Sequence, residues 1–215
     1  MALELWGSPT SGCTHRVMIT LNELGIDYDL SQITLQKGEQ KNPDYIKKYH
    51  PFGRIPVIQD GDLQLFESRA ICRYIVAKFG ASSSLDVITS GDPIMIGKFE
   101  KALSIDYSYF DPSVRTLCNE KLWKNPAEAA NPLEVQKATA MFKTALDYYE
   151  DLLGSNSYLV GDSFSLADIY VFTWIPYVKF LGLYDEVAAR PKFEGLWKRV
   201  SIRPSWQKVL KDMPQ

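Results

Sequence analysis

The chain has few cysteines and histidines, and this scarcity argues against several kinds of site. Its 215 residues include three cysteines and two histidines. The number of cysteines is odd, and they lie far apart without the spacing of metal ligands (Cys13, Cys72 and Cys118). This argues against a disulfide scaffold or a zinc module. His15 and His50 are isolated, so no metal site is expected. A reducing, cytoplasmic environment is therefore the expectation.

Long apolar runs and an excess of charge of one sign are also lacking. No run approaches the ~20 apolar residues that cross a bilayer, and Met1–Leu5 lacks the charged-then-apolar pattern of a signal peptide. With 24 basic and 26 acidic residues the net charge is −2, so neither nucleic acid nor a membrane is expected as a partner. The apolar fraction of 46% instead indicates an ordinary globular chain of one or two domains.

The first 80 residues alternate strand-like runs with helical patterns. The predicted order is strand (3–6), helix ending before Gly25, strand (26–30), short helix (43–48), two strands (55–59 and 63–66) and a helix from Ser68. Strand, helix, strand at the start predicts a parallel pair, and Asp60-Gly61-Asp62 between two apolar runs predicts a hairpin. The fold class expected here is α/β, with a mixed four-stranded sheet.

The sequence after residue 80 has the pattern of helices. Residues 81–89 are small, polar and aperiodic, as in a linker. Apolar residues then recur at helical spacing over 96–114 and 135–153, and shorter helices are predicted from Ser165, over 191–200 and over 205–211. Ser165 and Asp168 form a capping-box pattern with Asp in place of Glu. The predicted domains are thus residues 1–80 and an all-helical domain over 90–215.

Three stretches carry candidate chemistry. The loop from Gly7 to Arg16 leads from a strand into a helix start, where free backbone N–H groups and the helix dipole favour an anion, and the hydroxyl of Ser11 is within reach of that point. A cis bond before Pro56 would let the backbone of Ile55 pair with an extended peptide.

The third stretch is Phe66-Glu67-Ser68, a strand end followed by a helix start. Ser68 is expected to cap this helix, and the free N–H groups beyond it can hold a carboxylate. Glu67 can accept an ammonium group. A carboxylate pocket beside an ammonium acceptor suits the α-amino acid end of a ligand.

Together these stretches resemble the cytosolic glutathione S-transferases, in particular the phi class. The resemblance rests on the Ser11…Arg16 spacing, on Lys37–Pro43, Pro51–Pro56 and Asp60–Ile71, and on Phe164–Asp168, in this order along the full chain. It implies a thioredoxin-like N-terminal domain, an all-helical C-terminal domain that lines the acceptor pocket, and a homodimer. The implied partners are glutathione and electrophilic, apolar small molecules.

The resemblance also implies a role for individual residues. Glutathione is the co-substrate, no other cofactor is required, and Ser11 donates to its sulfur as the catalytic residue. The implied glutathione-binding residues are Gln40 and Lys41 for the glycine carboxylate, Arg54 in the same site, Ile55 and a cis Pro56 for the cysteinyl unit, and Glu67 and Ser68 for the γ-glutamyl end. Phe52 is the implied dimer contact. Gln40 stands where many members of the family have a histidine.

The implied reaction is attack by a glutathione thiolate on an electrophile, or reduction of an organic hydroperoxide. A free thiol has a pKa of about 8.5, and lowering it by about two units takes roughly 2.7 kcal/mol. A helix dipole supplies roughly 0.3–1 kcal/mol and a hydrogen bond to a charged group roughly 1.5–3 kcal/mol. Ser11 and the helix start suffice together, whereas either alone does not.

Two alternatives stay open at this point. The chain could carry apolar ligands without turnover, or Cys13, two residues after Ser11 near the helix start, could act as a thiol transferase. The aromatic residues Tyr107, Tyr109, Phe110 and Trp123 are either core of the helical domain or part of an acceptor pocket.

Overall fold

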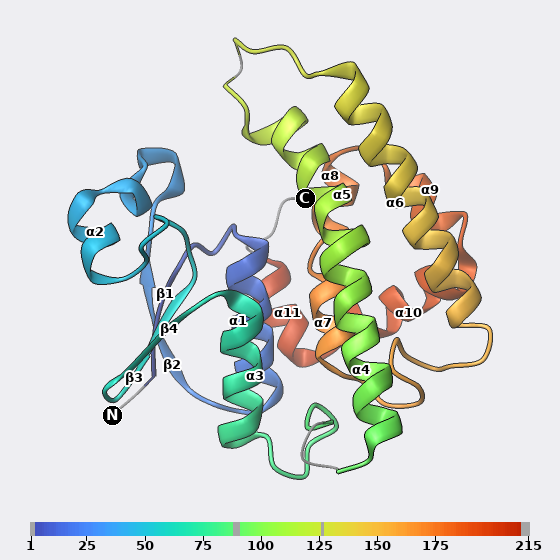
Figure 1. The fold of residues 1–215 in the computed structure, drawn as a ribbon, viewed down its shortest axis with the longest axis horizontal. Helices are drawn as coiled ribbons and strands as arrows, with labels where there is room; N and C mark the ends of the chain where they lie inside the picture. The colour runs from blue at the N-terminus through green and yellow to red at the C-terminus, as the bar shows by residue number, and fades with distance from the viewer. Residues whose placement is uncertain (1–2, 88–90, 126, 212–215) are drawn as a thin grey trace. The chain divides into compact units, whose positions relative to one another are not determined.

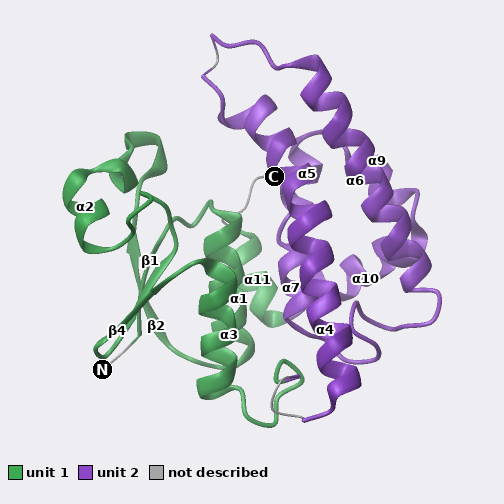
Figure 2. Cartoon of the chain, in the orientation of Figure 1, with its two compact units in different colours: residues 1–86, 204–213 green, residues 87–203, 214–215 purple. Residues whose placement is uncertain are grey.

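A computed structural model of the protein describes residues 3–87, 91–125 and 127–211, which divide into two units. Unit 1 comprises residues 1–86 and 204–213, and unit 2 comprises residues 87–203 and 214–215 (Figure 2). The boundary after Asp86 falls within the predicted linker 81–89, of which residues 88 and 89 lie outside the described residues. Within the described ranges no helix has both the length and the apolarity needed to span a membrane.

Unit 1 is built on a four-stranded sheet with the strand order β2-β1-β3-β4. The strand β1 (Leu3–Gly7) pairs in parallel with β2 (Tyr28–Gln32) and antiparallel with β3 (Val57–Asp60), which pairs antiparallel with β4 (Leu63–Phe66). This mixed sheet confirms the predicted fold class of the first domain.

Strand β2 begins two residues later than predicted, because Ile26 still belongs to the end of the preceding helix. Gly25 has φ +67, and the N–H of Ile26 donates to the carbonyl oxygen of Leu21 at 3.0 Å. This is the hydrogen bond of a Schellman motif, which closes the helix before the chain turns into the sheet.

Helices cover both sides of this sheet. Figure 1 shows α1 (Gly12–Glu23) and α3 (Ser68–Phe79) together on one side, and α2 (Pro43–Lys48) on the other. Two 3-10 turns, η1 (Leu35–Lys37) and η2 (Glu39–Lys41), precede α2.

The last helix of the chain, α11 (Pro204–Leu210), belongs to unit 1, whereas the prediction assigned all of residues 90–215 to the helical domain. It packs on α1, with Trp206 and Val209 fully buried. The side-chain amide of Asn22 donates to the Ser205 carbonyl oxygen at 3.5 Å, and the Ser205 hydroxyl donates to the Glu23 carboxylate. Local periodicity predicts that a segment is helical but not which partner its apolar face finds.

In the described part of unit 2 the regular elements are helices and helical turns, joined by loops. Its elements are α4 (Pro93–Ile105), η3 (Asp106–Phe110), α5 (Asp111–Cys118), η4 (Asn119–Trp123), α6 (Pro132–Leu152), α7 (Leu166–Phe172), α8 (Ile175–Phe180), α9 (Tyr184–Ala188) and α10 (Pro191–Ser201). This confirms the predicted all-helical second part. Its core is aromatic: Tyr149 stacks on Phe193 with centroids 5.6 Å apart, and both contact Phe110.

The π-helical turn η3 interrupts the helix over 96–114 that the periodicity predicts as one regular element, and a second π-helical turn, η4, follows α5. Of the four aromatic residues left open by the sequence, Phe110 is fully buried in the core, while Tyr107, Tyr109 and Trp123 are exposed. Trp123 joins Trp174 and Tyr177 in an aromatic cluster, with ring centroids 6.4 Å away from each. The core interpretation therefore holds for Phe110 alone.

The predicted capping box is present at the start of α7. The Asp168 carboxylate accepts from the Ser165 N–H at 2.8 Å, from its hydroxyl at 3.0 Å and from the Leu159 N–H at 3.0 Å. Complete burial raises the pKa of Asp168 to about 6, although these hydrogen bonds work in the opposite direction.

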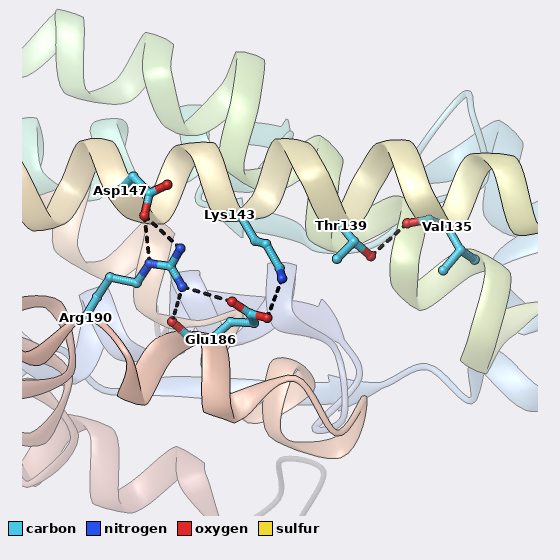
Figure 3. A network of polar contacts seen from close by, with 6 residues as sticks. All are labelled: Val135, Thr139, Lys143, Asp147, Glu186 and Arg190. Atoms are coloured by element: carbon cyan, nitrogen blue, oxygen red, sulfur yellow. Dashed lines mark hydrogen bonds and ion pairs between the residues drawn. The ribbon is translucent and has the colours of Figure 1, made fainter.

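An ion-pair network ties α9 and the start of α10 to the long helix α6 (Figure 3). The Arg190 guanidinium contacts Asp147 at 2.7 Å and Glu186 at 3.0 Å, and Glu186 also pairs with Lys143 at 2.6 Å. These cations lower the pKa of Glu186. The network fixes two short helices to the scaffold of unit 2.

Candidate functional site

The predicted site residues all lie on unit 1, at one end of its sheet. Trp6 near the end of β1 pairs with Val57 at the start of β3, and Val57 pairs with Phe66 at the end of β4. The loop after β1, the segment before β3 and the turn after β4 therefore leave the sheet at the same end. These segments carry Ser11, the Ile55–Pro56 pair and the Glu67–Ser68 pair.

Ser11 occupies the N-cap of α1. Its backbone is extended (φ −102, ψ 121), and its hydroxyl oxygen accepts from the Thr14 N–H at 3.4 Å. A hydroxyl has one hydrogen to donate besides its acceptor lone pairs, so the Ser11 proton stays available for an anion near the first turn. The side chain is half-buried, which keeps this donor accessible.

Gln40 and Lys41 lie against the turn that carries Phe52, Gly53 and Arg54. A Cβ on Gly53 would fall 2.8 Å from the Gln40 carbonyl oxygen, and the Lys41 ammonium donates to the Phe52 carbonyl at 3.3 Å. Lys41 and Arg54 are exposed cations, and the side-chain oxygen of Gln40 is buried without a hydrogen-bond partner among the described residues. This cluster offers positive charge and an unsatisfied amide at one place.

The peptide bond between Ile55 and Pro56 is cis, which confirms what the resemblance implied. Pro56 is buried at the entrance to β3 and Ile55 is half-buried. The Tyr45 hydroxyl donates to the Arg54 carbonyl oxygen at 2.9 Å, which ties this segment to α2.

Glu67 has a backbone conformation that residues with side chains rarely adopt, with φ +72 and ψ 103. It occupies the N-cap position of α3 without a side-chain capping bond, and the buried Ser68 is the first helical residue. The expectation that Ser68 caps this helix is therefore wrong, because the residue with non-helical dihedral angles is Glu67. The N-cap residue therefore makes no side-chain hydrogen bond to the first turn of α3, and strain of this kind often marks a ligand site.

His50, which the sequence indicates only as an isolated histidine without metal-ligand neighbours, also belongs to this region. It is buried, its ring packs on Phe66 with centroids 4.5 Å apart, and its electrostatic neighbours are Lys41, Arg54 and Glu67. It therefore lies between the cationic cluster and the turn that carries Glu67. Its surroundings could not be predicted, because the residues beside it in the sequence, Tyr49 and Pro51, do not indicate what packs around the ring.

Two further features bear on the alternatives. Cys13 is half-buried in the first turn of α1, and a guanidinium N–H of the buried Arg16 donates to its sulfur at 3.7 Å. A cleft of about 630 Å³ lies on unit 2, where Tyr158, Lys192 and Arg199 are among its lining residues, and none of the predicted site residues lines it. No three His, Cys, Asp or Glu side chains gather as metal ligands within the described ranges.

Comparison with known proteins gives a consistent result. Residues 1–77 match the family model "Glutathione S-transferase, N-terminal domain" and residues 132–198 match "Glutathione S-transferase, C-terminal domain". The chain is 40% identical to glutathione S-transferase PM239X14 of Arabidopsis thaliana over 172 residues, covering 79% of this chain and 78% of that protein.

Solved structures agree. Glutathione transferase F7 from Populus trichocarpa superposes with a TM-score of 0.91 at 30% identity, over 100% of both chains. Glutathione S-transferase I from maize, solved with an atrazine glutathione conjugate, has a TM-score of 0.87 at 27% identity over 99% of this chain and 98% of its own. The chain therefore belongs to the glutathione S-transferase family, as an enzyme of its phi class.

Proposed function

We propose that Ser11 activates the glutathione thiol and that the chain joins the resulting thiolate to electrophilic, apolar compounds. The observation that carries this is the Ser11 hydroxyl, which accepts from the Thr14 N–H and keeps its own proton to donate. A thiolate at the start of α1 receives that hydrogen bond and the field of the helix N-terminus. The thiol proton leaves to solvent, sulfur bonds to the electrophilic carbon, and the leaving group departs with its electron pair.

The rest of the site holds the peptide. Lys41, with Gln40, holds the glycine carboxylate, and Arg54 adds positive charge to the same side. The Ile55 backbone pairs with the cysteinyl unit beside the cis Pro56. Glu67 takes the ammonium of the γ-glutamyl end.

Ser68 completes the site at the start of α3, where the N-cap residue Glu67 makes no side-chain cap bond and the helix N-terminus attracts the α-carboxylate. All the side chains and backbone groups that we propose to bind or activate glutathione belong to unit 1, and glutathione is the co-substrate. In a second proposed reaction the same thiolate attacks the O–O bond of an organic hydroperoxide, which leaves as the alcohol, and a second glutathione then displaces water from the sulfenic acid to give the disulfide.

Further proposals concern assembly and location. Phe52 is 68% exposed, so its ring is accessible to a second copy of the chain, which supports its role as a contact in a homodimer. We place this dimer in the cytoplasm, with glutathione and small electrophiles as its partners. Analytical ultracentrifugation of wild type and Phe52→Ala tests the contact, and an unchanged dimer in the variant contradicts it.

Conjugation of glutathione to an aryl halide tests the role of Ser11. Ser11→Ala should lower kcat about 10- to 100-fold and leave the KM for glutathione within about threefold, because the lost hydrogen bond acts on the thiolate. Ser11→Thr should recover much of the loss. Since Ser11→Ala also removes a helix cap, Asn131→Ala is the matched control: it removes the cap of α6 and should leave kcat intact.

The assay also separates the alternatives. An unchanged kcat and an unchanged pKa of the bound thiol in Ser11→Ala contradict the mechanism. Tight binding of apolar ligands with no conjugation by the wild type indicates a carrier. Reduction of a glutathione mixed disulfide that depends on Cys13 indicates a thiol transferase.

A further inference from the structure

His50 makes two hydrogen bonds within the turn that follows it and one with α2. Its ring nitrogen Nδ1 accepts from the Phe52 N–H at 3.3 Å, and its carbonyl oxygen accepts from the Gly53 N–H at 2.8 Å. Its own N–H donates to the Tyr45 carbonyl oxygen at 3.4 Å. Because Nδ1 is an acceptor, the imidazole must be neutral, with its proton on Nε2.

The ring is also enclosed. His50 is 1% exposed, its ring packs on Phe66 and meets the edge of Phe52 at 6.1 Å between centroids. Phe66 directly precedes Glu67, and the 50–54 turn touches Gln40. The imidazole therefore links the two ends of the proposed glutathione site.

We propose that neutral His50 is a positioning residue for glutathione binding, and that its protonation in mildly acidic solution releases the 50–54 turn and weakens that binding. A protonated Nδ1 would point its hydrogen at the Phe52 N–H, so the hydrogen bond that fixes the turn would become a clash of two donors. The proposal rests on the glutathione site proposed above.

The charged groups around the ring decide which form is present. Burial lowers the pKa of His50, and the cations Arg54 and Lys41 lower it further, whereas Glu67 opposes them. Tyr45, on α2, has its pKa raised to about 12 by burial and stays neutral. His50 is therefore neutral at physiological pH, and the transition lies on the acidic side of the ordinary histidine range.

Binding of S-methylglutathione tests this, because that ligand has no ionisable thiol and its affinity does not depend on Ser11 as a donor to a thiolate. Calorimetric titrations between about pH 5 and pH 8 should show Kd rising about three- to tenfold as the pH falls, the size expected for one lost hydrogen bond. In His50→Asn, whose amide oxygen can accept from the Phe52 N–H but cannot be protonated, Kd should not vary with pH over this range. His50→Ala should bind more weakly than His50→Asn at neutral pH.

The chain offers an internal control, since His15 is its other histidine and lies on α1, with its Nε2 at 2.5 Å from the Pro9 carbonyl oxygen. NMR titration of the two imidazole C–H signals, assigned through the signal missing in His50→Asn, gives each pKa separately. The midpoint of the Kd curve should match that of His50. A match to His15, tighter binding in acid, or pH-independent binding by the wild type overturns this proposal alone, whereas absence of binding at every pH overturns the glutathione site with it.

Discussion

Gly53 lies so close to Gln40 that a side chain on residue 53 would meet the backbone carbonyl oxygen of residue 40. The glycine also has φ +58, in the left-handed region. The 50–54 turn and the η2 turn can approach one another only because residue 53 has no Cβ. This contact sets the position of Lys41 relative to Arg54.

Gly53→Ala should therefore lower the free energy of unfolding by about 2–4 kcal/mol, from the positive φ and the clash together, and raise the KM for glutathione. Gly61→Ala is a matched control: Gly61 has φ +59 but no atom within 4 Å of its Cβ position, so it should cost only about 1 kcal/mol. Urea unfolding and glutathione saturation curves measure both quantities. Equal effects of the two variants would show that the contact with Gln40 carries no energy.

Glu67 offers a test of strain at the site. Glycine accepts φ +72 more readily than glutamate, so Glu67→Gly should raise the free energy of unfolding by up to about 1 kcal/mol relative to Glu67→Ala. Both variants should bind glutathione more weakly than wild type, because both lack the carboxylate. If Glu67→Gly is no more stable than Glu67→Ala, the backbone at residue 67 stores no strain.

The raised pKa of Asp168 predicts that the free energy of unfolding depends on pH. Its pKa rises from 3.8 in the unfolded chain to about 6 in the fold, so the folded protein holds this proton more tightly. The resulting stabilisation is complete below the unfolded pKa and is lost as the pH rises through about 6, a change of about 3 kcal/mol. The stability of the wild type minus that of Asp168→Asn should thus fall between about pH 4 and pH 6 and level off above. A difference that stays constant in urea unfolding over this range contradicts the assignment.

The three cysteines should differ in reactivity. Burial raises the pKa of Cys118 to about 12 and Cys72 is fully buried, whereas Cys13 is half-buried at the start of α1. Brief alkylation of the native protein should therefore modify Cys13 alone, as peptide mass spectrometry can show. Protection of Cys13 by glutathione would place the sulfur near the bound peptide, and labelling of Cys118 in the native state would contradict the burial argument.

Much of unit 1 could be predicted because its signals are local. Asp60-Gly61-Asp62 marks the hairpin between β3 and β4, and the start of α3 at Ser68 is as predicted. The cis bond before Pro56 was implied by the family resemblance, not by composition. The sequence also predicts a helix start close to Ser11, and in the structure Ser11 is the N-cap of α1, a position that serine prefers.

What escaped prediction depends on contacts distant in the sequence. The positive φ of Glu67 and the burial of His50 are imposed by neighbouring strands and turns, and no local pattern encodes them. The expectation that Ser68 caps α3 is wrong because a serine at the first helical position and a serine at the N-cap look alike in the sequence. In unit 2 the π-helical turns leave the apolar spacing almost regular, so periodicity alone does not reveal them.

The position of α11 has a consequence for how the protein is made. Residues 1–86 leave the ribosome first, but the helix that covers α1 is translated only after the whole of residues 87–203. At bacterial or eukaryotic elongation rates this delay is about ten seconds. During that interval the nascent chain presents an uncovered apolar stripe on α1, and the N-terminal unit can be completed only after residues 87–203 have been made.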